Sequence, residues 1–121
     1  MDDIQLGGLR LVGTHGVLAE ERTRAQPFEV DLDLSVDLTR ASRSDDLADT
    51  VDYGAVVAAV VGVVEGAHCA LLERLAGRIA DDVLALDVRI AAVTVRVTKL
   101  RPPVPHDLAT ASVRLTRASS S

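Results

Sequence analysis

The sequence predicts a single α+β domain, in which four antiparallel strands form a sheet and two helices cover one of its faces. The order of the elements supports this fold class, because four segments with strand patterns and two with helical patterns follow one another as strand, strand, helix, helix, strand, strand. Strands separated from helices in this way are typical of α+β domains. The length of 121 residues fits one small domain.

The first two strands lie in the N-terminal third of the chain. Residues 4–13 mix apolar side chains with glycines and are expected to form a strand, which a turn at residues 14–16 ends. A charged loop follows at residues 17–26. The next strand has the clearest pattern in the chain, with apolar side chains alternating with acidic or polar ones at Phe28, Val30, Leu32, Leu34, Val36 and Leu38. This alternation predicts one buried face and one solvated, acidic face.

Both helices lie in the middle of the chain, after a polar connection at residues 40–50. Either Thr50 or Asp52 can cap the first helix, which is expected at about residues 53–65. Residues 66–68 interrupt the helical pattern, and the second helix is expected at about residues 71–86. Its buried stripe recurs at three- and four-residue spacing, at Leu72, Leu75, Ala76, Ile79 and Val83.

The third strand, at residues 89–99, ends on a charged residue. Val93, Val95 and Val97 share one face, and Lys99 has the same parity, so an ammonium group takes the place of the next apolar side chain. Lys99 is also the only lysine among 13 basic residues. A lysine can release its proton in a suitable environment, whereas an arginine cannot. Lys99 is therefore a candidate catalytic residue, although a solvated lysine at a strand end is the more ordinary interpretation.

Prolines at positions 102, 103 and 105 end this strand, and a fourth strand is expected at residues 109–116. The domain should span residues 1–117, with a disordered tail at residues 118–121. A four-stranded open sheet has two unpaired edges, which other copies of the chain can close. The chain contains one Phe, one Tyr and no Trp, so its aliphatic core would gain buried area from self-association. We therefore expect a homo-oligomer.

Composition and charge argue against several classes of partner. The net charge is -5 and the arginines are scattered among acids, which disfavours nucleic acid. Cys69 is the only cysteine, so no internal disulfide can form, and the three histidines lack the spacing of metal ligands. The longest apolar run, at residues 55–64, is too short to span a membrane, and the N-terminus has no signal-peptide pattern. The expected location is the cytoplasm.

Other residues could also carry chemistry. Tyr53 is the only tyrosine and stands at a helix start, where a phenol can stack on a flat ligand and pass a proton. Glu73 lies in the first turn of the second helix, where the helix dipole favours a carboxylate that could accept two hydrogen bonds from an amino-substituted heterocycle. Glu20 and Glu21 follow the turn at residues 14–16. Ordinary packing for the tyrosine and solvation for the acids are the alternative interpretations.

Taken together and in order, these landmarks closely resemble the dihydroneopterin aldolases of folate biosynthesis. The matching segments are LRLVGTHGV at residues 9–17, Glu21, QPFEV at residues 26–30, DTVDYG at residues 49–54 and LLERLA at residues 71–76. They are followed by VTK at residues 97–99 and PPVP at residues 102–105. The resemblance covers residues 2–117. It implies the tunnelling fold, in which subunits form a ring-like tetramer around a barrel, two rings commonly stack into an octamer, and active sites lie between neighbouring subunits.

The resemblance also implies how a substrate is bound, with no cofactor and no metal. Glu73 would anchor the amino group and a ring N–H of a pterin. The backbones of Val51 and Leu72 would contact the same ring. Tyr53 would reach the pterin from the neighbouring subunit and take part in proton transfer.

The implied reaction is the retro-aldol cleavage of 7,8-dihydroneopterin into 6-hydroxymethyl-7,8-dihydropterin and glycolaldehyde, without a Schiff base. Lys99 would be the catalytic lysine, and Glu21 the glutamate near the hydroxyalkyl tail of the substrate. Glu21 is preferred to Glu20 because its distance along the sequence from His15 and Gly16 fits the family, by a margin of one residue. An epimerase side activity is expected as well.

Alternatives stay open at this point. An epimerase of dihydroneopterin or its triphosphate would use the same residues; the acidic balance counts against a triphosphate, although Arg101 or Arg22 could contribute a basic rim. An oxygenase could act on the same intermediate. A zinc-dependent enzyme of the same fold is a further alternative, and so is a non-catalytic pterin-binding or structural oligomer.

Overall fold

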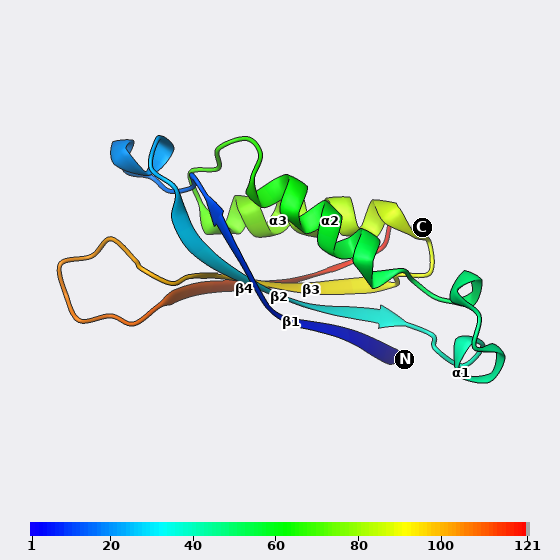
Figure 1. The fold of residues 1–121 in the computed structure, drawn as a ribbon. Helices are drawn as coiled ribbons and strands as arrows, with labels where there is room; N and C mark the ends of the chain where they lie inside the picture. The colour runs from blue at the N-terminus through cyan, green and yellow to red at the C-terminus, as the bar shows by residue number, and fades with distance from the viewer. Residues whose placement is uncertain (121) are drawn as a thin grey trace.

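The computed structural model describes residues 1–120 and confirms the predicted α+β fold class. Within these residues one antiparallel sheet carries two long helices on a single face (Figure 1). The long elements are β1 (Asp2–Gly13), β2 (Gln26–Val36), α2 (Tyr53–Val64), α3 (Leu72–Leu86), β3 (Ala92–Lys99) and β4 (Ala111–Ala118). Short helices interrupt the connections: η1 (Ala19–Arg22), α1 (Ala41–Ser44) and η2 (Leu47–Asp49).

The sheet has the strand order β1-β2-β3-β4, and each neighbouring pair is antiparallel. The alternation expected for β2 is confirmed, because Phe28 and Leu34 are fully buried and the acidic positions between them are only half-buried. A bulge interrupts the pairing of β1 with β2 between Leu6 and Leu9. Gly8 in this bulge has a φ of 74°, which glycine adopts without strain.

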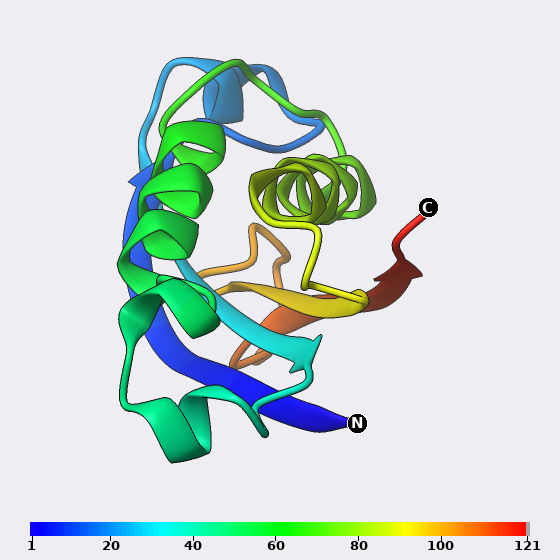
Figure 2. The same ribbon diagram turned by 90° about the vertical axis from the view of Figure 1, so that its right-hand side faces the viewer.

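The core lies between the two helices and the inner face of the sheet (Figure 2). It is built mainly from branched aliphatic side chains, and Phe28 supplies its phenyl ring. The fully buried side chains that α2 and α3 contribute are Val56, Val60, Val64, Leu75, Ala76, Ile79, Ala80 and Val83. Each large aliphatic side chain that is fully buried stabilises the fold by roughly 1.5–3 kcal/mol. The predicted stripe of the second helix therefore faces the sheet.

Local hydrogen bonds determine where α2 and β3 begin. Asp52 rather than Thr50 caps α2, since the Asp52 carboxylate accepts a 2.9 Å hydrogen bond from Gly54 N–H. β3 begins at Ala92, three positions later than the expected residue 89. The reason is a turn closed on Asp87, whose carbonyl and carboxylate oxygens accept hydrogen bonds from the two backbone N–H groups at Ile90 and Arg89.

Two strand ends also differ from the prediction. β2 ends at Val36 instead of continuing to Leu38, whose N–H donates to the Asp2 carboxylate at 3.0 Å. β4 continues to Ala118, and the next residue, Ser119, donates its N–H to Ala91 O at 2.8 Å. The expected disordered tail at residues 118–121 therefore starts too early; its last residue lies outside the described part of the chain.

The predicted site residues at the start of α2 lie far from those at the start of α3. α2 and α3 run in opposite directions above the sheet, so the end of α2 meets the start of α3 through residues 65–71 (Figure 1). α2 is 12 residues long, which separates its ends by about 18 Å. The start of α2 and the start of α3 consequently lie at opposite ends of the domain. No helix within residues 1–120 has the length and apolar character needed to cross a membrane.

Candidate active site

A buried ion pair stands at the end of β3. Lys99 is only 7% exposed and Glu21 only 5% exposed, and Lys99 Nζ lies 2.5 Å from Glu21 Oε2. The parity of β3 explains the lysine, because Lys99 lies on the same inner face as the buried Val95 and Val97. Glu20, one residue before its buried neighbour, is exposed. The structure therefore places Glu21, and not Glu20, beside the lysine.

Residues of the loop between β1 and β2 surround the Glu21 carboxylate. Glu21 lies in η1, and its Oε1 accepts a hydrogen bond of 3.2 Å from Leu18 N–H. Gly16 has a φ of 148°, and a Cβ at this position would overlap the Glu21 carboxyl group. Glycine is required here both for its backbone conformation and for the space that the carboxylate occupies. Gln26 completes the loop by donating from Nε2 to the Glu21 carbonyl at 3.4 Å.

The ion pair borders an open hollow of about 320 Å³, which we call the Lys99 pocket. Glu73, at the first turn of α3, is exposed and lines the same pocket, where the helix N-terminus stabilises its negative charge. Half-buried Leu72 lies beside it. The residues that line the pocket are Gly16, Val17, Leu18, Glu21, Ala70, Leu71, Leu72, Glu73, Lys99 and Pro103. Four of the six predicted site residues are thus brought together within one chain.

The other two predicted site residues lie elsewhere. Val51 is buried in the core next to the cap of α2, and Tyr53 is 62% exposed at the first position of α2. Neither lines the Lys99 pocket. Because α2 runs from Tyr53 toward the Lys99 end of the domain, a single chain cannot bring this tyrosine to the pocket. Val51 and Tyr53 are thus separated from the other four predicted site residues within one chain.

The structure adds one residue that the sequence did not single out for this site, His15. Its ring is fully buried, with Nε2 2.6 Å from Val64 O and Nδ1 accepting a 3.0 Å hydrogen bond from Cys69 N–H. These partners fit the neutral imidazole that carries its proton on Nε2. The next residue, Gly16, donates its N–H to Cys69 O at 3.0 Å. His15 therefore ties the turn before Glu21 to the end of α2 and to the segment before α3.

Burial lowers the pKa of His15 below its ordinary value of 6.5. The hydrogen bond to Val64 O opposes this effect, whereas the positive charges of Arg78 and Lys99 and the ring of His68 add to it. A proton on Nδ1 would also face the Cys69 N–H instead of accepting from it. The folded protein consequently holds this imidazole neutral at a pH where an unfolded chain would protonate it.

We expect the free energy of unfolding to fall as the pH drops below about 6.5. In this range the unfolded chain binds a proton at His15 that the folded chain does not, so protons stabilise the unfolded state. Urea unfolding at pH 7.5 and 5.5 should show this loss in the wild type and a smaller loss in His15→Gln. His106 is exposed, and His106→Gln is the matched control that should retain the wild-type loss. An equal pH dependence in all three proteins would show that His15 is not its source.

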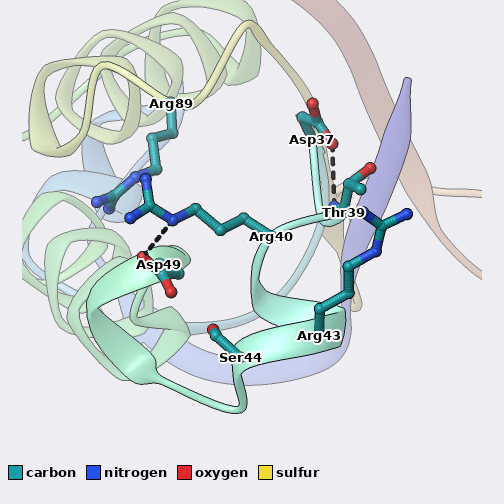
Figure 3. Close-up of a pocket in the computed structure, with 7 residues that line it drawn as sticks. All are labelled: Asp37, Thr39, Arg40, Arg43, Ser44, Asp49 and Arg89. Atoms are coloured by element: carbon teal, nitrogen blue, oxygen red, sulfur yellow. Dashed lines mark hydrogen bonds and ion pairs between the residues drawn. The ribbon is translucent and has the colours of Figure 1, made fainter.

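A larger hollow lies at the other end of the domain and contains none of the predicted catalytic residues. It measures about 650 Å³ and is lined by Asp37, Thr39, Arg40, Arg43, Ser44, Asp49 and Arg89 (Figure 3). Arg40 pairs with Asp49 at 3.0 Å, and Arg89 donates to Ala48 O at 2.6 Å. Figure 3 shows the guanidinium of Arg43 pointing away from the other two. Arg40 and Arg89 therefore hold the connection between β2 and α2 in place, and the three arginines do not converge on a common point.

The described residues also contain no group of three or more His, Cys, Asp or Glu side chains that could hold a metal ion together. His15 and His68 stack with their ring centroids 6.2 Å apart. His15 uses both nitrogens for backbone partners, and His68 Nδ1 lies 2.6 Å from Thr14 O. The two rings therefore serve the packing of the loops around the Lys99 pocket.

Comparisons of the sequence and of the structure with known proteins both find dihydroneopterin aldolases. The family model "FolB: Dihydroneopterin aldolase" matches residues 4–116. The dihydroneopterin aldolase of Staphylococcus epidermidis is 47% identical over 104 residues, which cover 86% of each chain. The E. coli dihydroneopterin aldolase, solved in complex with neopterin, superposes with a TM-score of 0.88 at 32% identity and covers 98% of this chain and 100% of its own.

A dihydroneopterin aldolase from Burkholderia thailendensis, solved bound to guanine, gives a TM-score of 0.77 at 26% identity, over 97% of this chain and 90% of that chain. The sequence match and the shared fold both extend over nearly the whole domain, including the loops and strand ends that form the Lys99 pocket. The chain belongs to the dihydroneopterin aldolase family.

Proposed function

We propose that this chain cleaves 7,8-dihydroneopterin into 6-hydroxymethyl-7,8-dihydropterin and glycolaldehyde, a carbon–carbon lyase step of folate biosynthesis. The observation that carries the proposal is the buried Lys99–Glu21 pair, which opens onto a pocket that Glu73 also lines. An amine and two carboxylates at one concave site supply an anchor and proton-transfer groups for a polar heterocycle with a hydroxylated side chain. Membership of the dihydroneopterin aldolase family supports the same assignment.

Glu73 is proposed to hold the ring of the substrate. A carboxylate accepts two parallel hydrogen bonds from an amino group and an adjacent ring N–H, which fixes the orientation of a flat ligand. Pterins and guanine share this donor pair, and solved family members are bound to neopterin and to guanine. Leu72, directly before Glu73 at the start of α3, would add backbone contacts. The hydroxyalkyl side chain would then extend toward Lys99 and Glu21.

Bond cleavage is proposed to begin with removal of the proton from the 2'-hydroxyl by a base acting through Lys99. The C1'–C2' bond breaks as the C2' carbonyl forms, and the electron pair moves into the C=N bond of the ring. Protonation of C1', with Tyr53 taking part, then yields the hydroxymethyl product. The substrate supplies its own electron sink, so the reaction needs neither a Schiff base nor a metal. Glu21 would position the ammonium or amine of Lys99 through their 2.5 Å contact.

The active site is proposed to form between two subunits of a homo-oligomer. Lys99, Glu21 and Glu73 would come from one chain, and Tyr53 with Val51 from its neighbour. This arrangement accounts for the exposed Tyr53 at the far end of α2. The free edges of β1 and β4 are the surfaces through which copies of the chain would join into a barrel.

Product analysis with 7,8-dihydroneopterin tests the proposal. We expect equal amounts of 6-hydroxymethyl-7,8-dihydropterin and glycolaldehyde from the wild type, and formation of both products slowed by about 10²–10⁴-fold in Lys99→Met. Formation of the 2'-epimer alone would assign an epimerase, because re-addition after the same cleavage inverts C2'. Pterin binding by a folded oligomer without turnover would instead identify a binding protein.

A further inference from the structure

A second hollow adjoins the Lys99 pocket and shares two of its lining residues, Glu21 and Pro103. It has a volume of about 270 Å³, and Arg24 and Arg101 are among the residues that line it. We propose that this second hollow, the Arg24–Arg101 hollow, binds a phosphate group at the end of the substrate's side chain. The chain would accordingly accept the 3'-phosphate monoester of 7,8-dihydroneopterin. This inference rests on the proposed function, since it assigns a substrate class to the same active site.

The order of the groups along the surface supports this assignment. Glu73 lies in the Lys99 pocket only, Glu21 lies in both hollows, and the two arginines lie in the second hollow only. A substrate whose ring is held by Glu73 and whose reacting carbons reach the Lys99–Glu21 pair therefore directs the end of its side chain beyond Glu21. That end carries the 3'-oxygen, and the hollow beyond Glu21 is lined by Arg24 and Arg101.

Both arginines are carried by anchored backbone. Gln26 Nε2 donates to Arg24 O at 2.9 Å and to Glu21 O at 3.4 Å, so one side chain holds the turn that presents Arg24. On the other side, Leu100 N–H donates to Pro27 O at 3.2 Å, which fixes the backbone next to Arg101. Anchoring lowers the entropy that a ligand must overcome to order the site.

The charges of this hollow also favour an anion. The guanidinium groups of Arg24 and Arg101 have no acidic partner in the described part of the chain. The negative charge of Glu21 is compensated by Lys99, which leaves exposed Glu20 as the only other acid that lines the hollow. Guanidinium groups bind phosphate oxygens with two parallel hydrogen bonds. The local balance is therefore positive, in contrast to the net charge of -5 for the whole chain.

The sequence alone suggested Arg101 or Arg22 for a basic rim. Arg101 does line the hollow, whereas Arg22 does not, and Arg24 takes its place. The reason is the position of Arg22 at the end of η1, from which its side chain is exposed outside the hollow.

The reaction remains balanced with a phosphorylated substrate. The C1'–C2' bond breaks as before, the 2'-hydroxyl loses its proton, and C1' gains one. The products are 6-hydroxymethyl-7,8-dihydropterin and glycolaldehyde phosphate, and no P–O bond is broken. No additional reactant is required.

The test compares kcat/KM for 7,8-dihydroneopterin 3'-phosphate with kcat/KM for 7,8-dihydroneopterin in the full-length protein. We expect the phosphorylated substrate to be preferred in the wild type. The ratio of the two values should fall about tenfold in Arg24→Gln and in Arg101→Gln, and further in the double variant, because hydrogen bonds to charged groups are lost. Arg22→Gln removes a neighbouring arginine that does not line the hollow, and its ratio should equal that of the wild type. Added salt should lower the wild-type ratio as well.

Two results would overturn the proposal. One is a wild-type ratio at or below one, and the other is a ratio that the double variant leaves unchanged while 7,8-dihydroneopterin is still cleaved. If neither compound is cleaved, the proposed function fails, and calorimetric binding of neopterin and neopterin 3'-phosphate decides the question of the phosphate site. Tighter binding of the phosphate that the double variant abolishes supports the site, and equal binding of the two compounds contradicts it.

Discussion

Lys99→Met is expected to reduce kcat for 7,8-dihydroneopterin by about 10²–10⁴-fold, the range that a positioned proton-transfer group contributes. The same substitution should lower the free energy of unfolding by about 3–5 kcal/mol, since it leaves the buried Glu21 carboxylate without its partner. Methionine keeps most of the apolar stem of the lysine, so the loss reflects the missing ammonium rather than a cavity.

A double variant separates the two effects. In Lys99→Met/Glu21→Gln the buried negative charge is removed as well, and a pair replaced by neutral residues is often as stable as the original pair. Stability should therefore return toward the wild-type value, whereas turnover should stay lost because the amine is still absent. Urea unfolding and single-turnover product analysis on the same protein preparations measure both quantities.

Two outcomes would contradict this account. Recovery of turnover together with stability would mean that Lys99 acts only as a partner for Glu21. Full turnover in the single variant would remove Lys99 from the mechanism. Glu21→Gln alone is the matched control. It retains the charge of Lys99 but removes the carboxylate that holds the lysine side chain in position.

Two inactive variants should restore activity to each other when they assemble into one oligomer. Lys99→Met disables one half of each proposed site, and Tyr53→Ala disables the half contributed by the neighbour. In an oligomer assembled at random from equal amounts of both, about a quarter of the sites combine an intact Lys99 with an intact Tyr53. Co-expression from two tagged genes, tandem purification and measurement of kcat would give the restored fraction.

The control for this experiment pairs Lys99→Met with Glu73→Ala. Both residues line the same pocket in one chain, so no mixture of these two variants contains a pocket with both Lys99 and Glu73 intact, and activity should stay absent. Restoration in the control, or none in a verified mixture of the first pair, would show that Tyr53 does not act across a subunit interface.

Strand periodicity explains why part of the site could be predicted. On β3 every second side chain faces the helices, so the parity of Lys99 with Val95 and Val97 was enough to predict the face on which the lysine lies, although not its burial. Glu73 likewise followed from the start of a helix with a clear apolar stripe. The same reasoning predicted the antiparallel sheet and the face that the helices cover.

Other parts of the site depend on contacts that no local pattern contains. The choice of Glu21 over Glu20 is made by the η1 turn and by the space left at Gly16. His15 finds its acceptor at Val64, 49 residues away, on a helix whose position depends on the whole core. The hollow with Arg24 and Arg101 likewise arises where two loops meet, and these loops follow different strands.

The single tyrosine has a spectroscopic consequence. The chain contains no tryptophan and one tyrosine, so Tyr53 is its dominant intrinsic fluorophore. Because Tyr53 is 62% exposed and lies outside the aliphatic core, its emission is insensitive to loosening of that core. A change in the intensity of its emission instead reports what covers the start of α2, which makes Tyr53 a built-in optical sensor of a neighbouring molecule, without any added dye.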